Sequence, residues 1–178
     1  MAKLKFSALS LGFALLSVLV ARAEPLKAAV FDVEVVESQL EAPTGIPPER
    51  LKKASVLLRD LLAKSGAVIV LDTAPAAAEI EKNLPLRTCN DCDLGIAKKL
   101  GADIEVSTVI QQTSPVLLSF SASIRDVKTG KVLSTGVVDV RGNSDETWAH
   151  GVKFLVKERL LEKPLPESAA ALRTLMDK

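Results

Sequence analysis

The sequence has very few of the side chains on which most enzymes and nucleic-acid-binding proteins depend. Its 178 residues include no tyrosine, one tryptophan, one histidine and two cysteines. Histidine-based catalysis would therefore depend on His150 alone, and aromatic platforms on which bases could stack are scarce. The chain carries 23 Lys and Arg against 22 Asp and Glu, so it also lacks the excess positive charge that strong nucleic-acid binding needs. We expect no nucleic-acid partner.

The first 23 residues have the pattern of a cleavable export signal. Lys3 and Lys5 precede an uncharged apolar stretch of 15 residues, 6–20, and Ala21 and Ala23 supply small side chains at the cleavage-recognition positions. This stretch is shorter than the roughly 20 residues that span a bilayer. We therefore expect a mature protein that begins at Glu24, has no stable membrane insertion and resides in an oxidising compartment, most simply the bacterial periplasm.

The mature chain begins with a pattern typical of parallel α/β proteins. β-branched and other apolar residues predict a strand over Lys27–Glu37. After a loop, leucines at spacings of three and four predict a helix from Pro47 until Gly66, and a short apolar run predicts a second strand over Ala67–Leu71. This order resembles a crossover unit with parallel strands. Two short helices are expected next, over Pro75–Asn83 and Asp93–Leu100.

Three strands are expected in the second half of the chain. Apolar and polar residues alternate in Ile104–Gln111 and more cleanly in Leu117–Arg125, which predicts one core face and one at least partly solvated face. Asp126 and Gly130 supply the turn chemistry of a hairpin, and Val132–Arg141 then returns as the third strand. The pattern predicts a three-strand antiparallel meander.

A helix is expected to follow the meander. Asn143 can cap its first turn, and Glu146 lies three residues on, where the helix dipole favours negative charge. His150 falls on the outer face of this helix, in water. The inner apolar face is formed by Trp148, Val152, Leu155, Val156 and Leu160. Together these elements predict a single α/β domain over residues 24–178, with helices packed on one mixed sheet.

Several segments resemble those of a group of periplasmic domains. They are residues 100–104 (LGADI), 108–110 (TVI) and 124–132 (IRDVKTGKV). The group is typified by the curli secretion channel component, the outer-membrane activators of penicillin-binding proteins and the amino-terminal domain of TolB. Within it, the chain is most similar to a family of small secreted proteobacterial proteins of unknown function. That second similarity is carried by residues 29–34, 89–93 and 139–148. It implies an adaptor, sensor or assembly accessory of the cell envelope, and it carries over no catalytic residue.

Cys89 and Cys92 are the only cysteines, and three interpretations of the pair are open. A structural disulfide is the simplest in an oxidising compartment, and closing so small a loop contributes about 2 kcal/mol in the chain-entropy model. A redox-active dithiol is the second, although Asp91 and Asp93 flank the pair and oppose thiolate formation. Metal binding is the third, but zinc needs about four ligands and no further thiolate exists. We expect no cofactor, and a c-type haem is excluded because Asp93 follows Cys92.

Other chemistry-bearing residues have simpler structural interpretations. Asp32 and Glu34 can share one face of the first strand, and we interpret them as ion-pair partners of Arg125 or Arg141. Trp148 lies on the apolar face of the last helix, where it belongs to the core or anchors a partner. The sequence does not separate these two roles.

The sequence as a whole favours a non-enzymatic periplasmic binding or adaptor domain, monomeric or weakly oligomeric. Its partner would be another envelope protein or a small ligand. The candidate interaction surface joins the loop Glu37–Pro48 to the segment around the cysteines, because irregular exposed segments carry function more often than strands. Its candidate residues are Asn90, Asp91, Asp93 and Trp148. The alternatives are a thiol-disulfide redox accessory that uses Cys89 and Cys92, or an accessory to a periplasmic dehydrogenase system.

Overall fold

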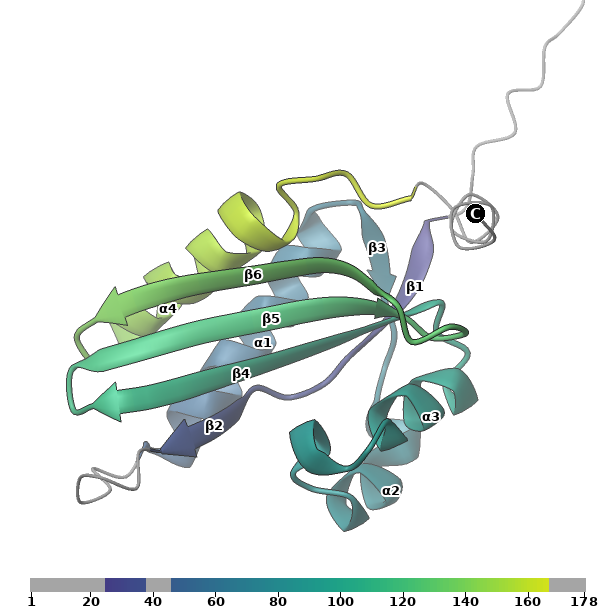
Figure 1. The fold of residues 1–178 in the computed structure, drawn as a ribbon, viewed down its shortest axis with the longest axis horizontal. Helices are drawn as coiled ribbons and strands as arrows, with labels where there is room; N and C mark the ends of the chain where they lie inside the picture. The colour runs from purple at the N-terminus through teal and green to yellow at the C-terminus, as the bar shows by residue number, and fades with distance from the viewer. Residues whose placement is uncertain (1–24, 38–45, 167–178) are drawn as a thin grey trace, which may run out of the picture.

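The protein folds around one six-stranded mixed sheet (Figure 1). The computed structural model describes residues 25–37 and 46–166, so the expected export signal lies outside the described residues. The strands are β1 (Leu26–Val30), β2 (Glu34–Glu37), β3 (Val68–Val70), β4 (Ile104–Ser114), β5 (Leu117–Asp126) and β6 (Val132–Arg141). The helices are α1 (Pro48–Lys64), η1 (Ala74–Ala76), α2 (Ala77–Lys82), η2 (Leu86–Thr88), α3 (Cys92–Lys99), α4 (Asp145–Phe154) and the π-helical η3 (Leu155–Leu160). The α/β class, the single mixed sheet, the meander and the C-terminal helix predicted from the sequence are confirmed.

The sheet combines a parallel part with an antiparallel part. Its order is β3-β1-β4-β5-β6, in which β1 runs parallel to both β3 and β4. The strands β4, β5 and β6 are antiparallel neighbours joined by short turns. β2 lies off this path and pairs in parallel with the second half of β4. As a result, β3 and β6 form the two edges of the main path, and β6 is much the longer of the two.

The first strand is interrupted, which corrects the expectation of one continuous strand over Lys27–Glu37. β1 and β2 are separated at Phe31–Val33, and both pair with β4. Contacts with α1 accompany the interruption. The Val33 amide donates to Ser55 Oγ at 2.9 Å, and Arg59 Nη2 donates to Asp32 Oδ1 at 2.8 Å. Because these contacts come from a helix more than 20 residues away, the local pattern of apolar residues does not predict the break.

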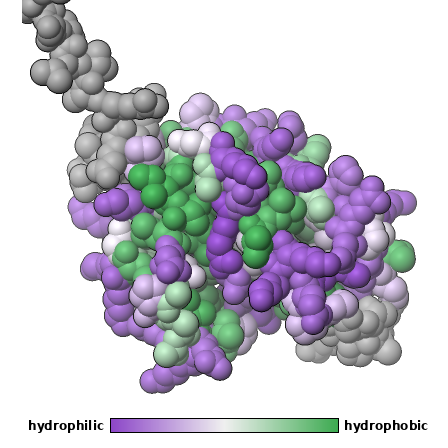
Figure 2. Space-filling model, turned by 180° about the vertical axis from the view of Figure 1, so that it is seen from behind, coloured by the Kyte–Doolittle hydropathy of each residue, from purple (hydrophilic) through white to green (hydrophobic). Residues whose placement is uncertain are grey.

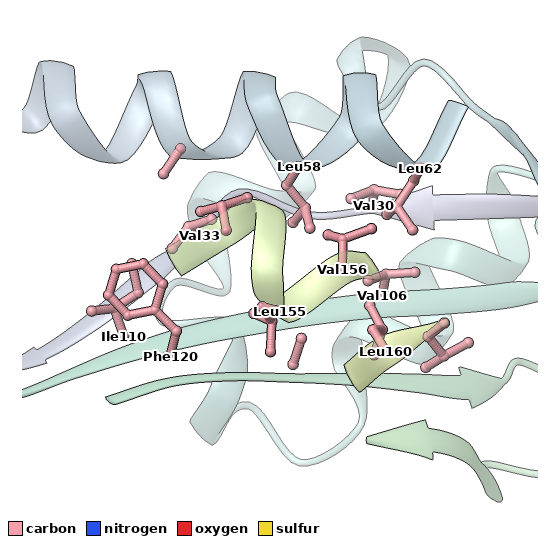
Figure 3. Packing of buried hydrophobic residues seen from close by; sticks show 14 of the residues in the cluster. Val30, Val33, Leu58, Leu62, Val106, Ile110, Phe120, Leu155, Val156 and Leu160 are labelled. Atoms are coloured by element: carbon pink, nitrogen blue, oxygen red, sulfur yellow. The ribbon is translucent and has the colours of Figure 1, made fainter. Parts of the chain in front are cut away.

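One face of the sheet is covered by α1, α4 and η3, which lie behind the three long strands in Figure 1. The apolar faces of these helices meet alternate residues of the strands, and Figure 3 shows how closely they pack. The labelled members of this core are Val30, Val33, Leu58, Leu62, Val106, Ile110, Phe120, Leu155, Val156 and Leu160. The outer surface of the same side alternates hydrophilic bands with hydrophobic areas (Figure 2).

The opposite face is covered only in part. The helices α2 and α3 pack over β1 and the start of β4, where Ala29, Phe31 and Ile96 belong to a second, smaller core. β1 is therefore buried on both faces, since Ala28 and Val30 belong to the main core. Among the described residues, no helix covers the remainder of β4, β5 and β6 on this side (Figure 1). This open face, made of the outward residues of the meander, carries a row of serines and positions the site described below.

The last helix begins one residue later than the sequence suggests. Its cap is Ser144, whose Oγ accepts from the Thr147 amide, while Thr147 Oγ1 accepts from the Ser144 amide. Asn143 instead accepts hydrogen bonds at Oδ1 from Trp148 Nε1 and Arg50 Nη1, both at 2.9 Å. The expected cap at Asn143 is therefore wrong, because this side chain is used to join α4 to α1. The predicted inner face of the helix is buried in the main core.

Candidate functional site

A tight turn before α3 carries two of the predicted interaction residues, Asn90 and Asp91, onto the open face. Cys89 follows η2 and Cys92 begins α3, and their Sγ atoms lie at bonding distance, with the Cα atoms 5.5 Å apart. Between them, Asn90 and Asp91 adopt left-handed backbone conformations, with φ of 56° and 67°. Asparagine and aspartate tolerate this conformation better than most residues. The turn thereby directs the Asp91 side chain towards the meander.

Arg125 of β5 forms the centre of an ionic cluster that joins this turn to the sheet. Its Nη1 donates to Asp91 Oδ1 at 3.1 Å, and its Nη2 donates to Asp93 Oδ2. Its Nε donates to Oε2 of Glu105, the residue directly opposite on β4, at 3.0 Å. The side chain of Asp91 is 70% exposed, whereas those of Asp93 and Glu105 are 7% and 0% exposed. One guanidinium therefore pairs with three carboxyl groups, most of them shielded from water.

Glu105 is the most strongly perturbed acid of this cluster. Burial raises its pKa from 4.5 to about 7, although Arg125 lowers the pKa and Asp93 raises it further. Burial alone would lower the pKa of Arg125, but Glu105 and Asp93 raise that pKa above its usual range, so the guanidinium stays charged. The second carboxyl oxygen of Glu105, Oε1, is buried and has no hydrogen-bond partner among the described residues. The cluster thus contains a carboxyl group that changes its charge near neutral pH.

A cleft of about 320 Å³ lies between the turn and the sheet. Its walls include Arg87 and Asn90, and its floor includes Ser107 and Ser123, whose hydroxyl oxygens are 3.0 Å apart. Arg87 Nη1 donates to Glu34 Oε2 at 3.2 Å, so this arginine is also paired. The lining of the cleft includes two arginines, Arg87 and Arg125, and two aspartates, Asp91 and Asp93, so its charges balance. The cleft is therefore polar, which suits a ligand rich in hydrogen-bonding groups.

The structure brings together most of the predicted interaction residues, but not all. Asn90 and Asp91 line the cleft as exposed residues, while Asp93 lines it with a buried side chain. Trp148 lies elsewhere, 2% exposed, with its ring 5.4 Å from that of Phe120 in an edge-on arrangement. It belongs to the core, so its selection as a candidate partner anchor needs correction. Of the candidate loop Glu37–Pro48, residues 38–45 lie outside the described residues.

The two acidic residues near the first strand take partners other than those expected. Asp32 pairs with Arg59 of α1, and Glu34 pairs with Arg87. Glu34 also accepts from the backbone amides of Leu86 and Arg87, which holds η2, the helix before the turn, against β2. Neither pairs with an arginine of the meander, because helix and turn residues from distant parts of the sequence lie closer.

Glu105 is the site residue that the sequence interpretation missed. The alternation in β4 placed it on the face expected to be at least partly solvated, yet its side chain is fully shielded by α3 and Arg125. One signal was present in the sequence. Once β4 and β5 are paired as a hairpin, Glu105 and Arg125 fall at opposite positions, where opposite charges attract.

The described residues do not assemble a metal site or a histidine-based catalytic set. No group of three or more His, Cys, Asp or Glu among them could hold a metal ion. His150 is 72% exposed, and its nearest ionic partner is Glu146 at 3.9 Å, which agrees with the expected outer face of α4. In the part of the chain that the structure describes, no helix is both long enough and apolar enough to cross a membrane.

Comparison with known proteins gives a family and a fold. A family model described as "Protein of unknown function (DUF2380)" matches residues 26–160. The chain belongs to this family. No curated protein matches the chain.

Solved structures with a similar fold include two of LpoB and one of TolB. The LpoB C-terminal domain from Salmonella enterica is 16% identical, with a TM-score of 0.50 over 68% of this chain and 87% of that one. The solution structure of E. coli LpoB is 17% identical, with a TM-score of 0.50 over 66% and 58% of the two chains. TolB from Acinetobacter baumannii is 17% identical, with a TM-score of 0.45 over 82% and 31%. The fold group and the unknown-function family suggested by the sequence are both confirmed.

Proposed function

We propose that this member of the family is a non-enzymatic binding domain of the bacterial periplasm, exported by the signal in residues 1–23. It holds another envelope protein or a small polar ligand in the cleft between the disulfide-closed turn and the open face of the meander. The protein acts as a monomer or a weak oligomer. The fold it shares with LpoB supports an envelope role by analogy only, because one fold hosts many functions.

The observation that carries the proposal is the way Arg125 fixes the turn onto the sheet. Arg125 pairs with Asp91 of the turn, with Asp93 of α3 and with Glu105 of β4, so the walls of the cleft are held in place before a ligand arrives. Preorganised sites bind more tightly because they lose less conformational freedom on binding. Asn90, at the rim, offers an exposed amide that can donate and accept hydrogen bonds.

The experiment is quantitative affinity capture of the protein expressed in the periplasm, with mass spectrometry of what it retains. Asp91→Asn removes a cleft charge while keeping a residue that tolerates the left-handed backbone. Asp60→Asn is the matched control, since Asp60 is also an ion-paired surface aspartate but lies on α1. We expect Asp91→Asn to reduce the retained partner about tenfold and Asp60→Asn to have no effect. Equal retention by both variants would exclude the cleft as the binding site.

A redox role is the second candidate, favoured by the position of Cys92 at the first residue of α3, where a helix dipole stabilises a thiolate. Acid trapping of thiols before capture separates the two candidates. Clients linked covalently through Cys92 in a Cys89→Ser variant would support the redox role. A noncovalent partner common to the wild type and the variant supports the binding role, in which the disulfide is structural.

A further inference from the structure

The strand β6 leaves one long backbone edge without a neighbour. Its ten residues pair with β5 on one side, and no other described strand pairs with the opposite side. In an antiparallel edge strand, alternate amide and carbonyl groups point away from the sheet and remain free to pair with a further strand. The edge at β3 is only three residues long, so β6 is the principal free edge of the main sheet.

The sequence of β6 does little to block such pairing. Natural edge strands are commonly protected by proline, by lysine or by a bulge. The stretch from Ser134 to Val140 contains no proline and no lysine, and its only charged residue is Asp139. The register irregularity of this hairpin lies near Arg125, opposite the start of β6. The central part of the edge is therefore regular and competent to pair.

A groove of about 580 Å³ runs beside this edge, between β6 and the outer face of α4 and η3. Val138, Val140 and Phe154 give it an apolar surface, and Phe154 remains 42% exposed. On the other face of the sheet, Val137 of β6 is 55% exposed. A strand added to β6 would thus find an apolar neighbour on each of its two faces.

The charges around the groove indicate the chemistry of the partner. Arg141, Lys153 and Lys157 line it together with Asp139 and Glu158, so cations outnumber anions. Residues 24–178 as a whole carry 20 Lys and Arg against 22 Asp and Glu, so the groove is more positive than the rest of the exported chain. A second copy of the chain would bring the same excess of cations to the groove, whereas an acidic segment would neutralise it.

We propose that β6 accepts an additional β-strand from a partner protein, an extended segment with an apolar centre flanked by carboxylates. Its backbone pairs with the free edge of β6. Its central apolar side chains pack against Val137 on one face and against Val138 and Phe154 on the other, while its carboxylates face Arg141, Lys153 and Lys157. Backbone pairing supplies affinity in this mode of recognition, and side-chain pockets supply specificity. This surface lies at the β6 edge of the sheet, whereas the cleft lies over β4 and β5, so it is independent of the function proposed above.

The test uses the protein purified from the periplasm and two synthetic probes: a short capped peptide with valines between flanking glutamates, and the same peptide with lysines in place of the glutamates. Amide shifts and slowed hydrogen exchange in NMR spectra report strand addition. We expect the glutamate peptide to affect residues 132–141 and 150–158 and to bind about tenfold more tightly than the lysine peptide. Phe154→Glu should weaken this binding by about tenfold or more.

The matched control is Val56→Glu, which places the same charge on a 57% exposed valine of α1. It should bind the glutamate peptide like the wild type. The proposal is overturned if about 1 mM glutamate peptide leaves the β6 amides unchanged, or if both peptides bind equally. It is also overturned if sedimentation shows a dimer that Phe154→Glu dissociates, or if binding appears only after residues 167–178 are deleted. Those results would assign the edge to a second copy or to the chain's own terminus.

Discussion

Glu105 and Arg125 lie directly opposite one another on β4 and β5, and the Arg125 Nε donates to Glu105 Oε2 at 3.0 Å. The Glu105 side chain is fully shielded from water, and only one of its two oxygens has a hydrogen-bond partner. A carboxyl group in such a position favours its neutral form, because burial disfavours charge more than one shared guanidinium stabilises it. The pair therefore couples the stability of the fold to pH.

The first prediction concerns this coupling. Because the pKa of Glu105 is raised from 4.5 to about 7 in the folded protein, the folded state binds the proton more tightly than the unfolded state. The resulting stabilisation is full below about pH 4.5 and is lost as the pH rises through about 7, by about 3 kcal/mol at most. Urea denaturation across this range should show the loss in the wild type. Glu105→Gln should not show this loss. If the free energy of unfolding of both proteins changes with pH in the same way, Glu105 is not the group responsible.

The second prediction concerns removal of the guanidinium. Arg125→Met leaves Glu105 buried without its partner and releases Asp91 and Asp93, so at about pH 8 we expect a loss of about 3–5 kcal/mol in the free energy of unfolding. At about pH 5.5 the loss should be smaller, because Glu105 is then neutral. Arg87→Met is the control. Glu34 retains two backbone amide donors, and this change should cost about 1 kcal/mol or less. Equal losses for both variants would remove the special role of Arg125.

Much of the fold could be predicted from local periodicity. The alternation in β5 fixes which residues face the core, because a slip of one residue would bury its serines and Arg125. The apolar face of the last helix was predicted residue by residue, and Trp148, Val152 and Leu155 are all buried in the main core. These patterns are informative because the spacing of residues within one strand or helix decides which of its side chains face the core.

The parts that could not be predicted depend on contacts between distant segments. Asp91 and Asp93 could be selected because they lie beside the cysteines, but their partner Arg125 lies more than 30 residues away. The break after β1 depends on Ser55 of α1, and the burial of Glu105 depends on α3. None of these relationships has a period along the chain, so composition and spacing do not reveal them.

The third prediction tests whether the disulfide holds the ionic cluster. Replacing both cysteines by serine should lower the free energy of unfolding by about 2 kcal/mol. Because Cys89 and Cys92 close the turn that presents Asp91 to Arg125, the effects of this change and of Arg125→Met should not add. A double-mutant cycle should give a coupling of about 0.5–2 kcal/mol. Additive effects would mean that the turn keeps its position without the disulfide.

The fourth prediction uses two helical glycines that differ in their surroundings. A Cβ on Gly151 of α4 would lie 2.7 Å from Val140 Cγ2 and 2.8 Å from Phe120 Cε2. Both contacts are too close, so Gly151→Ala should force α4 away from the sheet and cost about 1–3 kcal/mol. The substitution should not weaken the helix itself, because alanine favours helices.

Gly95 of α3 is the matched control, since a Cβ there would meet nothing within 4 Å. Neither glycine has a positive φ, so alanine is compatible with both backbones. Gly95→Ala should therefore stabilise the protein by about 0.5–1 kcal/mol through helix propensity alone. Urea denaturation should show a lower free energy of unfolding for Gly151→Ala than for the wild type, and a higher one for Gly95→Ala. Stabilisation by both would mean that α4 does not approach the sheet as closely as the structure shows, and the groove beside β6 would then have a different shape.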